Sequence, residues 1–281
     1  MKQLTNDMLR KRIKTIFEIG SGGFGQVEKA YDNERKEIVA IKTVENFVPT
    51  KQTMREFTFL LNNKHENIVS FNDSFVVGNK LYLSIEYCPY GNIAKYKSIM
   101  KESLVLCIIR DVSRALKYIH SLKMIHSDVK PQNILFSKTG DVKLADFGII
   151  HNQDSISIQK TGEKDGSPLY MAPEMLSGRP VDSSIDIWAL GITAFEMLTG
   201  VPLKLTGFEN IKEWIQQNKP KWSDDMKKLL ISMLEINPSM RPSAESLLKT
   251  TILRNLQETW LITSEVLMKK NQVYFEYSDD E

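Results

Sequence analysis

The amino-acid sequence predicts an α+β fold in two lobes, a small antiparallel β-sheet lobe with one helix followed by a larger, mainly α-helical lobe. In the first part of the chain, apolar and polar residues alternate in short segments, which is the period of β-strands. In the second part, apolar residues recur at the spacing of amphipathic helices. Pro89-Tyr90-Gly91-Asn92 marks the sharpest change in composition between the two parts. The expected units are residues 1–88, residues 89–254 and a C-terminal extension with an acidic tail, residues 255–281.

The composition of the chain limits the classes of function. It has 281 residues, of which 42% are hydrophobic and 26% charged, and this suits a soluble globular protein large enough for two lobes. Its 37 basic and 35 acidic side chains nearly cancel to a net charge of +2. No strong electrostatic field therefore favours nucleic acid or an anionic membrane as a partner.

Cysteine usage and the length of apolar runs indicate the compartment. Cys88 and Cys107 are the only cysteines and form no CxxC motif, so neither a disulfide framework nor a zinc site is predicted. No apolar run approaches the roughly 20 residues that span a bilayer, and the N-terminal residues lack the apolar segment of a signal peptide. We expect a cytoplasmic protein, with the nucleus as the alternative, and a monomer as the default state.

A glycine-rich segment follows the first predicted strand, near residues 16–19. Gly20, Gly22 and Gly25 fit the pattern GxGxxG, in which the absence of Cβ atoms lets backbone amides approach phosphate oxygens. A Walker A loop is excluded because Lys and Ser/Thr do not follow the last glycine. A Rossmann turn requires a helix next, but alternating segments on both sides of the polar turn 32–36 predict a hairpin. The glycines are thus expected between two antiparallel strands, and a glycine-rich hairpin without a ligand is the alternative.

The second strand of this hairpin carries a lysine among apolar residues. Because side chains alternate along a strand, Ala40 and Lys42 are expected on one face. A solvated surface lysine is the commoner role of this residue type. Residues 50–63 then predict a helix, from which Glu56 could meet Lys42 across the lobe, with a solvated Glu56 as the alternative. Two further strands, near residues 69–77 and 81–87, complete a small sheet.

The stretch from His126 to Asn133 concentrates polar groups in the second lobe. It contains a candidate proton acceptor, Asp128, a cation, Lys130, and the Asn133 amide as a candidate metal ligand. A surface turn would also explain this composition. Asp146 follows about a dozen residues after Asn133 across a predicted hairpin, which would place a second oxygen ligand beside the first. A hard cation such as Mg²⁺ prefers such oxygen ligands.

Helices are predicted for most of the remaining chain. Residues 102–122 have an amphipathic pattern, and residues 184–198 are apolar on nearly every side, which predicts a central buried helix. The polar segment 152–164 is expected to be a mobile loop, and the acidic end, 276–281, to be frayed. Further helices are expected near residues 207–217, 223–235 and 243–250.

These motifs together resemble the eukaryotic protein kinase family over about residues 14–250, in the order in which the family has them. Lys130, two residues after Asp128, and the segment 166–168 resemble the serine/threonine branch rather than the tyrosine branch. The resemblance implies the bilobal protein-kinase fold, with the whole chain as one kinase domain. It also implies transfer of the ATP γ-phosphate to protein Ser and Thr hydroxyls, with Mg²⁺ as cofactor.

The resemblance also implies a role for each candidate residue. Asp128 matches the catalytic aspartate that accepts the substrate proton, and Lys130 matches the cation near the γ-phosphate. Lys42 resembles the lysine that binds the α and β phosphates, and Glu56 resembles its partner on a helix. The implied Mg²⁺ ligands are Asn133 and Asp146. The implied nucleotide-binding residues are Gly20, Gly22, Gly25, Val27, Ala40, Lys42, Ile85 (the gatekeeper position), Glu86, Cys88 and Leu135; Glu174, Arg241 and Asp186 are implied to be structural.

Three positions depart from the commoner family pattern. Ser127 stands where the family usually has the Arg that holds a phosphorylated activation loop, so we expect activity that does not depend on loop phosphorylation. Asn92 and Gln132 stand where arginine-directed members carry Glu, so no strong preference for upstream basic residues is expected. Ile149 resembles members that favour Thr over Ser as acceptor.

Two alternatives to a protein kinase stay open. A pseudokinase, acting as a nucleotide-binding or scaffolding module, usually lacks the lysine, the catalytic Asp or the metal-binding Asp, and all three are present here as Lys42, Asp128 and Asp146. A small-molecule or lipid kinase of similar shape should lack the peptide-docking segment that residues 167–174 resemble.

Overall fold

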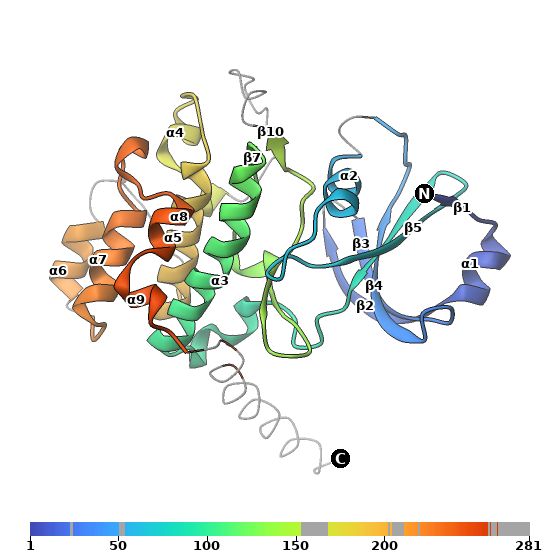
Figure 1. Ribbon diagram of the computed structural model, residues 1–281, viewed down its shortest axis with the longest axis horizontal. Helices are drawn as coiled ribbons and strands as arrows, with labels where there is room; N and C mark the ends of the chain where they lie inside the picture. Colours follow the sequence, from blue (N-terminus) through green and yellow to red (C-terminus); the bar gives the residue numbers. More distant parts are fainter. Residues whose placement is uncertain are drawn as a thin grey trace, which may run out of the picture.

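The computed structural model describes residues 1–22, 25–50, 54–152, 168–201, 203, 211–218, 220–257, 259 and 263. Within these residues the chain forms two lobes, a β-sheet lobe and a mainly helical lobe, which lie side by side in Figure 1. The predicted α+β architecture is therefore confirmed. The predicted mobile loop at 152–164, except Asn152 at the end of β10, and the acidic end at 276–281 lie outside the described residues.

The first lobe is built on one six-stranded sheet with the strand order β1-β5-β6-β4-β3-β2. Strands β2 to β6 pair antiparallel, whereas the short β1 pairs parallel with β5. Residues Gly22 and Gly25 face each other at the end of the β2–β3 hairpin, which places the glycine-rich segment between antiparallel strands as predicted. The strands are β1 (Lys2–Gln3), β2 (Ile13–Gly22), β3 (Gly25–Asp32), β4 (Glu37–Val44), β5 (Phe71–Val77) and β6 (Lys80–Glu86).

Helix α2 (Arg55–Asn62) is the helix that positions the site in this lobe (Figure 1). Its apolar side chains Phe57, Phe59 and Leu60 are buried, as the helical spacing predicts. The helix begins five residues later than the prediction from residue 50, and residues 51–53 lie outside the description. Met54 at its N-cap provides no side-chain hydrogen bond, so the sequence carries no capping signal there.

An N-terminal helix, α1 (Asn6–Arg12), has no counterpart among the predicted elements. The Thr5 side chain caps it by accepting a hydrogen bond from the Met8 amide. At its end, Arg12 is only 7% exposed, and its Nη2 lies 3.0 Å from both Asp32 Oδ2 and Asp73 Oδ2. The helix is thus joined to strands β3 and β5 by a buried ion-pair network.

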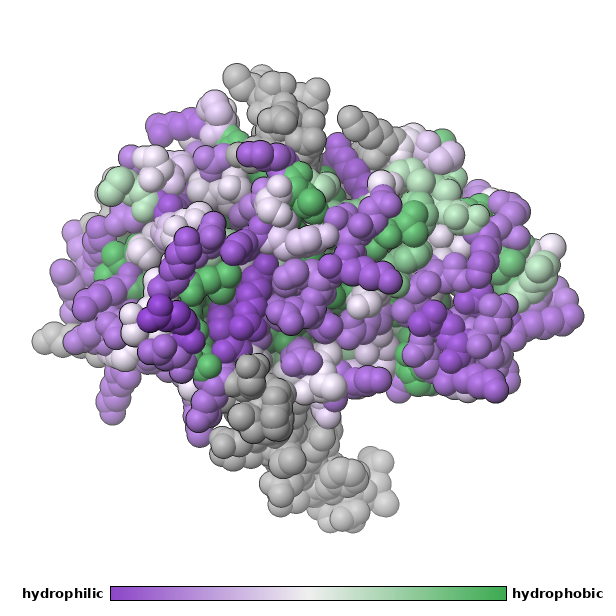
Figure 2. All heavy atoms as spheres, viewed as in Figure 1, coloured by the Kyte–Doolittle hydropathy of each residue, from purple (hydrophilic) through white to green (hydrophobic). Residues whose placement is uncertain are grey.

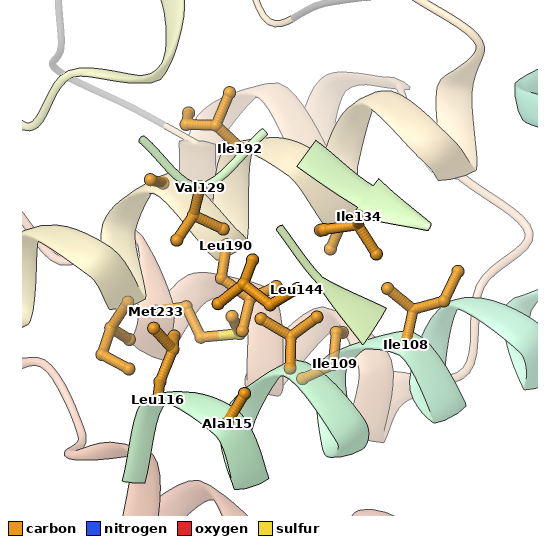
Figure 3. Packing of buried hydrophobic residues seen from close by; sticks show 14 of the residues in the cluster. Ile108, Ile109, Ala115, Leu116, Val129, Ile134, Leu144, Leu190, Ile192 and Met233 are labelled. Carbon is orange, nitrogen blue, oxygen red and sulfur yellow. The ribbon is translucent and has the colours of Figure 1, made fainter. Parts of the chain in front are cut away.

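The second lobe is organised around helices α3 (Glu102–Ser121) and α5 (Ser184–Thr199). Nearly every residue of α5 is buried, which confirms the predicted central helix. Figure 3 shows Ile108, Ile109, Ala115 and Leu116 of α3 packing toward Leu190 of α5 and its neighbours. The remaining elements are η1 (Ile93–Ile99), β7 (Met124–Ile125), η2 (Pro131–Asn133), β8 (Ile134–Phe136), β9 (Val142–Leu144), β10 (His151–Asn152), η4 (Pro168–Tyr170), α4 (Pro173–Leu176), α6 (Ile211–Asn218), α7 (Asp224–Met233), η5 (Pro238–Met240), α8 (Ala244–Leu248) and α9 (Thr251–Arg254).

The lobes are joined by the chain between Glu86, where β6 ends, and Ile93, where η1 begins. Pro89 to Asn92 lie in this connection, and the division at residues 88 and 89 stays a prediction. Hydrophilic residues cover much of the face seen in Figure 2. In the described part of the chain, no helix combines the length and the apolar character needed to cross a bilayer.

Candidate active site

Lys42 on β4 and Glu56 on α2 meet between the sheet and the helix. Lys42 Nζ lies 2.6 Å from Glu56 Oε2 and 2.9 Å from Asp146 Oδ1, so one ammonium links two elements of the first lobe to the second. Burial opposes the charged form of Lys42, but the charges of Glu56 and Asp146 outweigh it and raise the pKa of Lys42 above its ordinary value. Lys42 is therefore a permanent cation in the cleft.

The position of Asp146 near Lys42 depends on its backbone conformation and on an aromatic neighbour. Its φ of 62° lies in the left-handed region, and the next residue, Phe147, is fully buried. The Phe147 ring stacks on Phe59 of α2 at a centroid distance of 4.5 Å and meets the His126 ring edge-on at 4.9 Å. The position of α2 is thus coupled to the position of the Asp146 carboxylate. Burial would raise the Asp146 pKa, but the Lys42 charge outweighs it and lowers this pKa, which keeps the group ionised.

Asp128 is oriented by two neighbours from its own loop. Lys130 Nζ lies 2.7 Å from Asp128 Oδ2, and Asn133 Nδ2 donates to the same oxygen at 2.8 Å and to the Asp128 carbonyl at 2.9 Å. The short helix η2, which begins with Pro131, turns Asn133 back toward Asp128. The turn alternative is therefore wrong for this stretch, because its polar residues converge on one carboxylate in a largely buried position.

Asp186, in the first turn of α5, holds this loop through hydrogen bonds. It accepts hydrogen bonds from the His126 amide at 2.9 Å and the Ser127 amide at 2.8 Å, and His120 Nε2 lies 2.8 Å from its Oδ2. Burial would raise the pKa of Asp186, but the hydrogen bond from His120 and the nearby backbone donors lower it below its ordinary value. The ionised carboxylate holds Ser127 at a φ of 69°, a strained value for a non-glycine residue.

His126 has a defined orientation in this loop. The Asp128 amide donates to its Nδ1 at 3.3 Å, so the ring proton is assigned to Nε2, which lies 3.2 Å from the Ala145 carbonyl. His126 thus links the segment before Asp128 to the segment before Asp146.

The predicted metal ligands fit a hard cation. The Ala145 amide donates to the Asn133 carbonyl at 2.9 Å, so the chain segments that carry Asn133 and Asp146 lie side by side. Asn133 uses its amide nitrogen to hold Asp128, and Asp146 uses Oδ1 to hold Lys42, which leaves one side-chain oxygen on each for a metal. Two such oxygens, completed by phosphate and water, suit Mg²⁺. Among the described residues, no cluster of three or more His, Cys, Asp or Glu side chains provides an all-protein metal site.

The predicted nucleotide-binding residues are distributed over the sheet and the connection. Val27 lies opposite Lys42 and Ala40 opposite Ile85 in neighbouring strands, which places them on one face of the sheet. Leu135 of β8 comes from the second lobe and pairs with Asn92 at the end of the connection. Glu86 Oε2 lies 3.5 Å from Lys143 Nζ, and burial raises the pKa of the Cys88 thiol to about 12. Burial therefore opposes formation of a thiolate at Cys88.

Gly20 and Gly25, two of the three predicted loop glycines, differ in what the backbone demands of them. At Gly25, φ is 118°, and a Cβ would lie 2.0 Å from the Thr43 carbonyl oxygen on the neighbouring strand. At Gly20, a Cβ would meet no atom within 4 Å. Gly25 is therefore required by the fold, whereas Gly20 could carry a Cβ without a clash.

The predicted structural pair of the second lobe is present. Arg241 Nη1 and Nη2 lie 2.5 and 2.8 Å from the two oxygens of Glu174, and both residues are buried. This bidentate contact ties α4 to the segment before α8.

Two polar residues beside the catalytic loop were missed by the sequence analysis. The Tyr170 hydroxyl donates to Glu196 Oε2 at 2.6 Å, and the two residues come from η4 and α5. They are 26 positions apart, and although Tyr170 lies in the segment 167–174, no sequence pattern links it to Glu196, so only the fold brings them together.

Known proteins support the family that these residues indicate. A family model described as "Protein kinase domain" matches residues 13–253. Serine/threonine-protein kinase Nek5 of Mus musculus is 34% identical over 251 residues, 85% of this chain and 40% of that protein. Serine/threonine-protein kinase pakA of Dictyostelium discoideum is 32% identical over 87% of this chain and 22% of its own length. Serine/threonine-protein kinase sid1 of Schizosaccharomyces pombe is 32% identical over 92% of this chain and 57% of its own length.

The chain spans only about a fifth to three fifths of the length of these relatives. The region it shares with them nevertheless contains all the residues assembled at the site, from the glycines of β2 and β3 to Arg241. Because the family model covers most of its length, the chain belongs to the eukaryotic protein kinase family and, with its relatives, to the serine/threonine branch.

Proposed function

We propose that this protein is an active protein kinase that transfers the γ-phosphate of ATP to Ser and Thr hydroxyls of protein substrates. The observation that carries the proposal is Lys42, which contacts Glu56 at 2.6 Å and Asp146 at 2.9 Å simultaneously. The proposed phosphate-binding cation therefore contacts both its partner helix and the proposed metal-binding carboxylate.

The residues divide the reaction between proton transfer and charge neutralisation. Asp128, held by Lys130 and Asn133, is positioned to accept the proton of an incoming hydroxyl. Lys42 and Lys130 are the cations available to the phosphates, and Asn133 and Asp146 would hold Mg²⁺. The metal, when bound, would neutralise charge on the phosphate oxygens. Positioning and preorganised charge rather than covalent catalysis then lower the barrier.

The proposal is tested by incubating the protein with labelled ATP, Mg²⁺ and a peptide array. We expect label on peptide Ser or Thr, and a loss of about 100- to 10,000-fold in kcat for Asp128→Ala, because proton acceptance is removed. Nucleotide binding by Asp128→Ala, followed by calorimetry, should persist because Lys42 is intact. Binding of ATP without any transfer by the wild-type protein would instead identify a pseudokinase, and label confined to a metabolite would identify a small-molecule kinase.

We also propose that this activity does not require phosphorylation of the activation loop. Ser127 offers a hydroxyl where a loop phosphate would need an arginine, and a neutral hydroxyl cannot supply the charge-assisted hydrogen bonds that a phosphate accepts. The candidate phosphorylation sites Ser155, Ser157, Thr161 and Ser167 lie outside the described residues. Phosphatase-treated protein, shown by mass spectrometry to be unmodified, should keep most of its kcat/KM. Activity that vanishes and returns with loop phosphorylation would contradict this.

Two substrate preferences follow from the remaining departures in sequence. We expect no strong selection for upstream Arg, because Asn92 and Gln132 carry no charge. We also expect Thr to be the better acceptor, since Ile149 resembles members with that preference. A positional peptide library tests the first, and phosphoamino-acid analysis of a mixed substrate tests the second; dominant upstream Arg or mainly phosphoserine would refute them.

The compartment is also a proposal. Cys88 and Cys107 are both buried, and neither forms a disulfide within the described residues, which suits a reducing compartment such as the cytoplasm. Fractionation of cells that express the protein tests this, with the nuclear fraction as the alternative outcome.

A further inference from the structure

The C-terminal extension contacts a hairpin whose strands lead to the two proposed metal ligands. Strand β8 begins directly after Asn133, and strand β9 ends two residues before Asp146. The Ala145 amide donates to the Asn133 carbonyl at 2.9 Å and joins the two ends. In the turn between the strands, the Gly140 carbonyl accepts a hydrogen bond from the Thr263 hydroxyl at 2.9 Å. Thr263 and the ligands are thus at opposite ends of one short hairpin.

The hairpin depends on its surroundings for its position. β8 and β9 have three residues each and form a separate two-stranded sheet, and such a pair is only marginally stable by itself. The Leu144 amide donates to the Asn67 carbonyl at 2.8 Å, and the Phe136 amide donates to the Gly91 carbonyl at 2.9 Å. These contacts lead to the first lobe and to the connection between the lobes. From the second lobe, apolar side chains of α3 pack toward the hairpin (Figure 3), and Thr263 adds a directional contact.

The turn is braced internally. Ser137 Oγ accepts hydrogen bonds from the Thr139 amide at 3.2 Å and the Asp141 amide at 3.1 Å. The Gly140 amide donates to the Ser137 carbonyl at 3.0 Å. A displacement of the turn is therefore passed on to both strands.

The extension is fixed to α3 before it reaches the turn. Arg110 donates to the Gln257 carbonyl at 2.9 Å and to the Thr259 hydroxyl at 2.6 Å, and this hydroxyl donates to Asp111. Arg110 and Asp111 are only 5% and 2% exposed, and a buried ion pair needs its remaining donors satisfied. The extension supplies these partners. It is thus an integral part of the lobe, although the family model ends at residue 253.

We propose that Thr263 is a positioning residue for the Mg²⁺ site. Its fully buried hydroxyl holds the turn of the hairpin, so that Asn133 and Asp146 keep the separation that one cation requires. Mg²⁺ demands near-ideal octahedral geometry, so added motion of its two ligands weakens its binding. The inference rests on the proposed function, in which Asn133 and Asp146 hold the metal.

The first test needs neither metal nor nucleotide. Thr263→Val replaces the hydroxyl with a methyl group of similar size. We expect hydrogen exchange at the Leu144 and Ala145 amides to become about two- to ten-fold faster, the range that one lost neutral hydrogen bond allows. Amides in the centre of α5 should exchange as in the wild type. Equal acceleration in α5 would indicate a global loss of stability and would overturn the inference.

The second test measures the response to the metal. A non-hydrolysable ATP analogue is titrated by calorimetry with Mg²⁺ in excess and again with EDTA. In Thr263→Val, the gain in affinity that Mg²⁺ provides should fall about two- to ten-fold, whereas the affinity in EDTA should stay the same. Faster exchange with an unchanged response to Mg²⁺ would show a structural contact only and would also overturn the inference.

Two further variants assign the effect to the hydroxyl of Thr263. Thr263→Ser keeps a hydroxyl and should restore both measurements. Thr250→Val is the matched control, because it removes a hydroxyl that donates to the Leu247 carbonyl at 2.7 Å in the same lobe, and it should change neither. An effect of Thr250→Val equal to that of Thr263→Val would refute the assignment.

The proposed function is checked separately. Label transfer by the wild type reports on kinase activity, whereas hydrogen exchange reports on the hairpin whether or not transfer occurs. A wild-type affinity that does not respond to Mg²⁺ would refute the ligand assignment and this inference together, and it would leave the transfer assay unaffected.

Discussion

At the scale of single residues, the chemistry depends on backbone conformations that most side chains avoid. Ser127 and Asp146 both have positive φ, and each is held by polar contacts, Ser127 by Asp186 and Asp146 by Lys42. Strain of about 1–3 kcal/mol per residue persists only where the surroundings fix the conformation. The contacts of Asp186 and Lys42 therefore maintain geometry as well as charge.

Gly25 allows a direct test of a backbone requirement. Gly25→Ala should destabilise the protein by about 1–3 kcal/mol, because its φ of 118° excludes a side chain and its Cβ would overlap the Thr43 carbonyl. Gly20→Ala is the matched control and should change the free energy of unfolding by less than about 1 kcal/mol, since its Cβ meets open space. Urea unfolding measures both. Equal losses in the two variants would contradict the distinction.

Asp186 predicts a dependence of stability on pH. Its pKa is lower in the folded than in the unfolded state, so its stabilisation is fully present above the unfolded pKa of about 4 and is lost as pH falls through the folded value. Asp186→Asn should therefore lower the free energy of unfolding by about 3 kcal/mol at pH 7. On acidification the variant should lose less stability than the wild type. Unfolding by urea from pH 7 down to about pH 2, which extends below the unfolded pKa of about 4, measures the difference. Parallel pH profiles would count against this role.

At the scale of elements, helix α2 joins the sheet to the catalytic residues of the second lobe. Glu56 contacts Lys42, and Phe59, one turn along the same helix, stacks on Phe147 beside Asp146. A shift of α2 would therefore disturb the ion pair and the aromatic contact together.

Removal of the Phe59 ring should reveal this coupling. Phe59→Ala should lower the free energy of unfolding by about 3–5 kcal/mol, because the ring is 2% exposed, and should also weaken ATP binding by releasing α2. Leu61→Ala on the same helix is the control, since Leu61 is 48% exposed and should change neither quantity appreciably. Urea unfolding and calorimetric titration with ATP measure the two effects. ATP affinity unchanged in a folded Phe59→Ala protein would rule out the coupling.

The sequence predicts local elements better than it predicts contacts between elements that are far apart in the chain. The hairpin of β3 and β4 and the helices α3 and α5 follow from periodicity, because burial of one face imposes a regular pattern on nearby residues. The two-residue strand β1 carries no such pattern, since its pairing depends on β5 some 70 residues later. The Tyr170–Glu196 contact was missed for the same reason, whereas Lys42, Asp128 and Asp146 were found through motifs shared by a family.

At the scale of the whole molecule, residues beyond the predicted second lobe also contribute to it. Arg110 of α3 donates to the Leu256 and Gln257 carbonyls and to the Thr259 hydroxyl, and Thr259 in turn donates to Asp111. Thr263 donates to the Gly140 carbonyl at 2.9 Å, in the turn between β8 and β9. The start of the C-terminal extension is thus anchored to the lobe by buried and partly buried hydrogen bonds.

The N-terminal ion-pair network should contribute strongly to stability. Arg12→Leu would leave Asp32, which is fully buried, without the guanidinium that lowers its pKa against the effect of burial. We expect Arg12→Leu to lower the free energy of unfolding by about 3–5 kcal/mol at pH 7. The difference from the wild type should narrow as pH falls, because the buried carboxyl then takes up a proton. Lys11→Ala is the control, because its pairing with Asp7 is largely exposed. A loss in Arg12→Leu no larger than in Lys11→Ala would contradict the network's role.

The same segment determines how this protein can be shortened. The family match begins at residue 13, so a chain trimmed to the family limits would lose β1, α1 and Arg12 together. Strand β5 would then present an open edge to other chains, and open edges promote aggregation. A recombinant protein intended for assay or crystallisation should therefore include residues 1–12, because β1 pairs with β5 at the edge of the sheet and Arg12 joins the segment to Asp32 and Asp73.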